Sequence, residues 1–237
     1  ILGVVVALLT VALFLAVAGF QPLQVYMAMV DGAFGSGYRI SQTVINTIPL
    51  VILSLGIAIA FRMKFWNIGA EGQILMGGFF GSYFAYHFTT LPKPLLLLLM
   101  LLAGTVGGAL WAFFPAWLKA KFHANESITT LMLNYVALKW IEYLASGPWK
   151  DPTALGYPRM PRFDEQAILP NLFGVHIGWV IAVILVVVVY LFLNYSKKGF
   201  EIAILGESEN TARYAGININ RTVLLAVCLS GALCGLT

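Results

Sequence analysis

Long apolar segments alternate with short polar connectors along most of this chain. At a rise of about 1.5 Å per residue, a helix needs about 20 residues to cross the hydrocarbon layer of a membrane. Segments of that length and character lie at 1–20, 42–61, 68–88, 94–118, 127–146, 174–195 and 221–237. The pattern therefore predicts an all-α polytopic membrane protein with about seven spanning helices.

The chain starts without a methionine and stops inside an apolar segment, so we expect a single transmembrane domain over 1–237 that is incomplete at both ends. Residues 1–20 are about as long as a spanning helix and have neither a basic flank nor a small-residue cleavage pattern, which favours a span over a removable signal peptide. Glycines within the apolar segments, as in MGGFFGSYF (76–84) and AGTVGGALW (103–111), predict close helix packing.

One long polar connector separates the last two apolar segments. Residues 197–220 read KKGFEIAILGESENTARYAGININ. Because polar residues of this density stay in water, we expect a folded connector over 196–220. It should contain two short helices, 201–205 and 210–215, separated by Gly206 and ended by Gly216.

Composition and charge narrow the class of protein. Of the 237 residues, 60% are hydrophobic and only 10% are charged, and the mean hydropathy is +0.87. A soluble core cannot absorb so many apolar side chains, so the chain is an integral membrane protein. The net charge of +4 comes from basic residues scattered over short connectors, which favours charge placement beside the membrane over a nucleic-acid-binding surface.

The basic residues are distributed unequally between alternate connectors. Five belong to one side, namely Arg39, Lys93, Lys150, Arg159 and Arg162. Eight belong to the other side, namely Arg62, Lys64, Lys119, Lys121, Lys197, Lys198, Arg213 and Arg221. The positive-inside rule predicts that the second set, and with it the 196–220 connector, faces the cytoplasm.

Polar residues gather at the start of one predicted span. The stretch FWNIGAEGQILMG (65–77) contains Asn67, Glu71 and Gln73 together with three glycines. Polar groups at membrane depth usually face a cavity or a partner, and glycines permit a broken helix whose backbone lines a path. In the other interpretation, Glu71 lies near the membrane interface, where its negative charge stabilises the N-terminus of its own helix. Both interpretations stay open from the sequence.

A second polar cluster is NESITTLMLNY (125–135). Asn125 suits a helix cap, and Thr130 and Asn134 are four positions apart on one helix face. Thr130 and Asn134 can form hydrogen bonds to a neighbouring helix or to a polar solute.

The two cysteines, Cys228 and Cys234, fit packed side chains, and the three histidines lack metal-ligand spacing. No hydrolase or phosphate-binding motif occurs, so we expect neither an enzyme nor a metal site.

Three passages together resemble a known family: 65–77, NESITTLMLNYVA (125–137) and KKGFEIAILGESENTARYAGIN (197–218). The chain resembles, from about Thr43 onward, the membrane permease subunit of a bacterial ABC importer. The branch is the one for nucleosides and simple sugars within the branched-chain-amino-acid and ribose-type permeases. The resemblance implies a coupling helix in the connector, with an alanine at Ala203 where an arginine is expected. The implied coupling residues are Gly199, Glu201, Gly206, Glu207, Ala212, Arg213 and Gly216.

The resemblance also implies the assembly and the location. A cytoplasmic ATP-binding subunit would hold the ATP, so this chain would need no cofactor. A second permease subunit, identical or homologous, and an extracytoplasmic substrate-binding protein would complete a multi-pass complex among the lipids of the bacterial inner membrane. The residues implied along the solute path are Asn67, Glu71, Gln73, Thr130 and Asn134. The alternative is an ion-gradient-driven secondary transporter or channel, which would rely on Glu71 and a broken helix.

Overall fold

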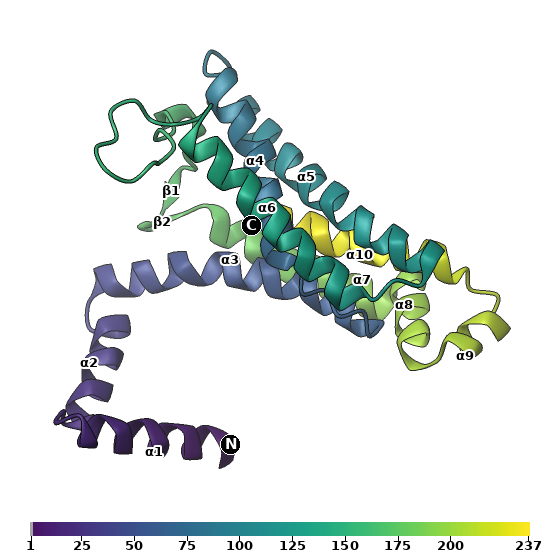
Figure 1. Ribbon diagram of the computed structural model, residues 1–237, viewed down its shortest axis with the longest axis horizontal. Coiled ribbons are helices and arrows are strands. Elements are labelled where there is room, and N and C mark those ends of the chain that lie inside the picture. The colour runs from purple at the N-terminus through teal and green to yellow at the C-terminus, as the bar shows by residue number, and fades with distance from the viewer. Residues whose placement is uncertain (1) are drawn as a thin grey trace.

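The computed structural model describes residues 2–237 and is almost entirely helical (Figure 1). The helices are α1 (Leu2–Val17), α2 (Pro22–Phe34), α3 (Gly37–Arg62), α4 (Ala70–His87), α5 (Lys93–Phe122), α6 (Glu126–Ser146), α7 (Gly178–Tyr195), α8 (Lys197–Glu207), α9 (Glu209–Tyr214) and α10 (Ile219–Leu236). A single 3-10 turn, η1 (Glu165–Ala167), precedes two short antiparallel strands, β1 (Asn171–Leu172) and β2 (Val175–His176). The prediction of an all-α polytopic protein is confirmed.

The number of membrane spans differs from the expectation of about seven, which is not confirmed. In the described residues, four helices are long and apolar enough to cross a membrane: α3, α5, α7 and α10. The α1 and α2 helices would add a fifth span only if taken together, and they are bent by 117° at the break between them. Helices α4 and α6 form close to the predicted positions, but their polar and small residues lower their hydropathy.

Several helices of the bundle make close backbone contacts at glycines. Helix α10 packs along α3, α4 and α5. A Cβ atom on Gly77 would collide with the backbone of Gly235, and one on Gly108 would collide with the backbone of Gly231. The glycine-rich segments therefore do bring helices into backbone contact, as predicted, because no side chain separates them.

Helices α1 and α2 extend away from the bundle (Figure 1). Nearly all of their side chains are exposed, and none is buried. The α2 helix occupies the Gly-rich connector that follows the first apolar segment, and the Asp31 carboxylate at its end pairs with Arg39 of α3. This ion pair and the hydrogen bond from Thr43 Oγ1 to Ala33 O, 2.9 Å long, fix the turn between α2 and α3.

The two ends of the bundle are different. Helices α8 and α9 lie at the end where α3 and α5 finish, and the long loop after α6 lies at the opposite end (Figure 1). The first end holds the basic side chains of Arg62, Lys119 and Lys121 in the last turns of their helices. This is the end that the positive-inside rule assigns to the cytoplasm.

The connector is folded into two helices, but their boundary is not the predicted one. Gly206 lies inside α8 rather than between the helices. The break falls at Ser208, whose hydroxyl accepts a hydrogen bond from the Thr211 amide and caps α9. The serine hydroxyl accepts a hydrogen bond from a first-turn amide that has no partner within the helix. A new helix can therefore begin at Ser208, and no glycine is needed to separate α8 from α9. Gly216, with φ of +71°, follows the end of α9 as predicted.

Candidate functional site

The segment between α3 and α4 leaves the helical path while staying largely buried. Side chains alternate along it: Met63, Phe65 and Asn67 are buried, whereas Lys64 and Trp66 are exposed. The alternation places one row of side chains inside the bundle without a regular helix. The 63–69 segment is therefore a packed connection, and the polar group it buries needs hydrogen-bond partners.

Asn67 finds its partners on two helices. Its Nδ2 donates to Gln73 Oε1 on α4 and to Ser230 Oγ on α10, each at 3.1 Å. Its Oδ1 accepts from Gln73 Nε2 at 3.1 Å and from the Gly69 amide at 3.2 Å. The three side chains of Asn67, Gln73 and Ser230 are 3%, 1% and 0% exposed. Together they tie the 63–69 segment, α4 and α10 into one buried junction.

Asn134 of α6 binds the start of α4 from the other side. Its Oδ1 accepts from the Gly72 amide at 2.8 Å, and its Nδ2 donates to Ile68 O at 2.9 Å. The Gly72 amide lies in the first turn of α4, where no carbonyl of the same helix can accept it. A Cβ atom on Gly72 would lie 2.8 Å from Asn134 Oδ1. Asn134 thus caps α4 from a neighbouring helix, and glycine permits the approach.

The predicted solute-path residues therefore separate into two groups. Asn67, Gln73, Thr130 and Asn134 are buried close to the start of α4, and the Thr130 hydroxyl donates to Glu126 O of its own helix at 2.7 Å. Glu71 is exposed in the first turn of α4, where a carboxylate is favourable toward the helix dipole. The junction uses the polar groups of Asn67 and Asn134 within the chain, and a role in contacting solute stays a prediction.

Two features of the junction lie outside the sequence prediction. The motifs in the sequence do not include Ser230, which bonds to Asn67; its signal is its position as one of the few polar residues in the apolar segment of α10. Trp111 of α5 places its Nε1 close to Gly72, and this buried donor has no hydrogen-bond partner within residues 2–237. The indole N–H is thus available to a polar atom that enters the junction.

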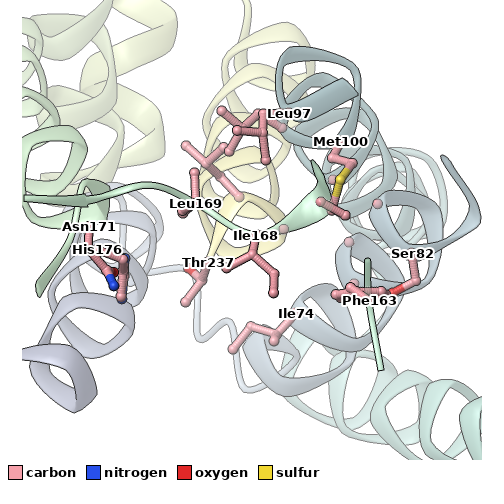
Figure 2. Close-up of a pocket in the computed structure, with 18 residues that line it drawn as sticks. Ile74, Ser82, Leu97, Met100, Phe163, Ile168, Leu169, Asn171, His176 and Thr237 are labelled. Atoms are coloured by element: carbon pink, nitrogen blue, oxygen red, sulfur yellow. The ribbon is translucent and has the colours of Figure 1, made fainter. Parts of the chain in front are cut away.

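A separate cavity of about 660 Å³ lies where the segment before α7 meets the bundle, and Phe163, Ile168 and His176 of that segment line it (Figure 2). It is lined by α4, α5, the segment around 163–176 and the end of α10, and its wall is mainly apolar. Its polar side chains are Ser82, Asn171, His176 and Thr237. None of the five predicted path residues lines it. Among the lining glycines of α4 and α5, Gly78 faces open space, whereas Gly77 and Gly104 pack against the backbone of Gly235.

The connector is packed onto the bundle at two places. Ser196 Oγ accepts from the Gly199 amide at 2.9 Å, and a Cβ atom on Gly199 would collide with the backbone end of α7. At the other end of α8, a Cβ atom on Gly206 would collide with the backbone of Arg62 and approach Met63 Cα. Helix α8 therefore rests directly on the turn that begins the 63–69 segment.

The seven predicted coupling residues divide by exposure. Gly199, Glu201, Gly206 and Ala212 are buried within this chain, and Lys198 Nζ donates to Glu201 Oε2 at 2.7 Å. Glu207, Arg213 and Gly216 are exposed. The first group fixes the connector on the bundle. In the second group, Glu207 and Arg213 present charges to the solvent, where another protein can reach them.

These observations define a class: a multi-pass helical membrane protein with a folded connector at its basic end, attached to a buried polar junction. Residues 39–237 match the family described as branched-chain amino acid transport system, permease component. The chain belongs to this family.

Curated relatives align with the whole chain. It is 34% identical to the glucose ABC transporter permease protein TsgB13 of Haloferax volcanii, covering 65% of that protein. It is 30% identical to the guanosine ABC transporter permease protein NupP of Bacillus subtilis and to the nucleoside ABC transporter permease protein NupB of Lactococcus lactis, covering 69% and 68% of them. The chain thus spans about two thirds of the length of these relatives. No solved structure matches it.

Proposed function

We propose that this chain is a permease subunit of an ATP-driven importer for nucleosides or simple sugars in the bacterial plasma membrane. It would form part of the solute path, and a separate cytoplasmic subunit would hydrolyse ATP. The family and the names of its relatives, which are permease proteins for guanosine, nucleosides and glucose, support this function. A second permease subunit and an extracytoplasmic binding protein would complete the importer.

The observation that carries the proposal is the direct contact between α8 and the end of α3. Gly206 contacts the backbone of Arg62 and Met63, and four residues beyond Met63 the same segment supplies Asn67 to the buried junction. A force on the connector would act on a backbone contact, which has no flexible side chain to absorb it. Movement of α8 would therefore displace the segment that holds α4, α6 and α10 together.

The junction also fits the position of a gate on the solute path. Its side chains offer amide and hydroxyl groups, which are the groups that hydroxyl-rich solutes such as nucleosides and sugars can bind. When its internal hydrogen bonds open, Asn67, Gln73 and Asn134 would regain free donors and acceptors, and the unpartnered Trp111 Nε1 lies beside them. Solute passage would then replace internal hydrogen bonds with solute hydrogen bonds.

The test follows labelled guanosine uptake in cells that lack other nucleoside uptake systems. The complete permease and its genomic neighbours are expressed with the intact ATPase subunit or with one that cannot hydrolyse ATP, and excess ribose serves as competitor. Uptake that needs ATP hydrolysis and ignores ribose supports a nucleoside importer. Competition by ribose would assign simple sugars, and uptake without the ATPase would contradict the proposal.

The exposure of Glu71 removes one of the two features on which an ion-gradient-driven transporter would rely, and the irregular 63–69 segment is the feature that remains. That alternative relies on Glu71 as an intramembrane carboxylate. Glu71 is exposed in the first turn of α4, close to the basic end of the bundle, and a carboxylate there is favourable without any bound ion. Uptake that collapses with the ion gradient while the ATPase is inactive would restore this alternative.

A further inference from the structure

The loop between α6 and η1 is anchored firmly at its base. The Trp149 ring stacks on Phe79 of α4, with centroids 5.3 Å apart and an interplanar angle of 23°. The Tyr86 hydroxyl donates to Pro161 O at 2.9 Å, and the Phe163 ring packs on the Tyr86 ring at 5.2 Å. Both ends of the loop are therefore fixed to the same face of α4, which leaves the residues between them to project from the bundle.

A hydrogen-bonded neck closes the projecting part, residues 151–159. The Asp151 amide donates to Arg159 O at 2.8 Å, and Arg159 Nε donates to Asp151 Oδ2 at 3.2 Å. The Thr153 hydroxyl and amide donate to Asp151 Oδ1 at 2.6 and 2.9 Å. The Thr153 hydrogen bonds lower the pKa of Asp151 below its usual value. This carboxylate accepts hydrogen bonds from both Thr153 and Arg159, so it ties the two sides of the neck together.

The tip of this loop is apolar and almost fully exposed. Leu155 is 99% exposed and Tyr157 is 92% exposed. Gly156 between them has φ of +93°, a conformation that side chains disfavour, and it lets the two side chains stand at a sharp turn. Pro152 and Pro158 flank the tip and restrict its backbone. The closed neck and the two prolines thus hold two large apolar side chains in solvent, where a partner can reach them.

The surroundings of the tip favour a protein over the membrane interior as its partner. Residues 154–158 have no regular secondary structure, and an irregular backbone exposed to hydrocarbon would leave its polar groups unsatisfied. Exposed Lys150, Arg162 and Asp164 lie next to the neck and keep its base in water. The loop stands at the end of the bundle opposite α8 and α9 (Figure 1), so a protein arriving from the aqueous phase meets it first.

We propose that the 151–159 loop is the docking surface for the extracytoplasmic solute-binding protein, with Leu155 and Tyr157 entering an apolar depression on that protein. This inference rests on the proposed import function. Tyrosine is enriched among the residues that dominate protein interfaces, because its ring is large, rigid and partly polar. The closed neck keeps the loop ordered before docking, so little conformational entropy is lost on binding.

The test measures how the binding protein activates the reconstituted importer. The complete complex in proteoliposomes receives increasing amounts of guanosine-loaded binding protein, and ATP hydrolysis is recorded. We expect Leu155→Ala with Tyr157→Ala to raise the half-activating concentration by roughly tenfold or more with little change in the maximal rate. Phe173→Ala, at an 89% exposed aromatic on the neighbouring hairpin, is the control and should leave the concentration unchanged.

The outcomes separate this inference from the proposed function. If the unmodified complex ignores the binding protein, the proposed function fails and the docking assignment fails with it. If the unmodified complex responds and the double variant behaves like it, or Phe173→Ala shows the same loss, only the docking assignment is overturned. A photo-cross-linker on Leu155→Cys should capture the binding protein, whereas adducts only with lipid or with a second permease copy would overturn the assignment.

Discussion

Single residues in this chain act mainly at contacts between helices, either by forming hydrogen bonds across them or by leaving room for a close approach. Asn134 supplies both an acceptor to the Gly72 amide and a donor to Ile68 O, so one side chain satisfies two backbone groups of a different element. Glycines act in the opposite way, since Gly206 and Gly72 contribute no side chain and let the neighbouring residue approach. The effects of substitution therefore depend on the neighbour across the contact rather than on the helix that carries the residue.

Replacing Asn134 with leucine should destabilise the protein. The Gly72 amide and Ile68 carbonyl would lose their partners inside the bundle, and each unsatisfied backbone group costs about 1–3 kcal/mol. The thermal unfolding temperature of the detergent-purified protein should fall clearly for Asn134→Leu. The exposed neighbour Tyr135→Leu is the matched control and should unfold near the unmodified temperature. Equal temperatures for both variants would contradict the capping role.

Gly206→Ala and Gly78→Ala should have opposite effects on stability. Alanine favours a helix over glycine by about 1 kcal/mol when nothing opposes it. Gly78 has no atom within 4 Å of a Cβ, so its variant should be neutral or more stable. At Gly206 the added Cβ meets the backbone of Arg62, which cannot rotate away, so this variant should unfold at a lower temperature. If Gly206→Ala stabilised the protein, the close contact between α8 and the backbone of Arg62 would be contradicted.

Among the elements, the α8–α9 connector is part of the bundle core rather than a loose loop. Ile202, Leu205 and Ala212 belong to the same buried cluster as Ile59 of α3 and Ala226 of α10. The cluster fixes α8 and α9 on the ends of the spanning helices. The exposed charges of the connector are consequently held in place before any partner arrives, which lowers the ordering cost of binding.

Substitutions at exposed residues of the connector should reduce uptake, whereas substitutions at buried ones should lower the unfolding temperature. Glu207→Ala with Arg213→Ala should reduce ATPase-dependent guanosine uptake severalfold at an unchanged unfolding temperature, because both side chains are exposed. Ala212→Leu should lower the unfolding temperature, because Ala212 is fully buried and leucine would overpack its site. Asn210→Ala, also exposed on α9, is the control for uptake. Unchanged uptake in the double variant would remove Glu207 and Arg213 from the coupling surface.

At the scale of the molecule, the spanning helices separate two chemically different ends. One end carries α8, α9 and most of the unpaired basic side chains among the described residues, and the other carries the 151–159 loop and the β1–β2 hairpin (Figure 1). The glycine contacts between α4, α5 and α10 lie between these ends. This polarity fits the proposed importer, in which the two ends would meet different partners.

Labelling from the two sides of the membrane tests this polarity. A membrane-impermeant maleimide should label Tyr157→Cys in intact cells, and it should label Tyr214→Cys only after the membrane is opened, because both side chains are more than 90% exposed but lie at opposite ends. The unmodified chain, with Cys228 and Cys234 inside α10, gives the background. Labelling of both variants in intact cells would contradict the orientation.

Much of this organisation could be predicted from local patterns. The apolar segments predicted helices near the observed positions, and the glycines predicted close helix contacts, because both depend on residues near one another in the chain. The local pattern predicts the two helices of the connector but places Gly206 between them. In the structure Gly206 lies inside α8, and its close approach to the backbone of Arg62, far away in the chain, is a tertiary contact that no local pattern contains.

The sequence by itself determined the membrane class, the helical elements and the unequal charge of the two ends, since hydropathy, helix length and basic residues act locally. Only the tertiary structure decided which polar residues meet. Asn67 and Ser230 are 163 positions apart yet share a hydrogen bond, while Glu71, four positions from Asn67, remains in solvent. Buried polar groups must find partners wherever the packing of helices brings them, and no local pattern specifies that pairing.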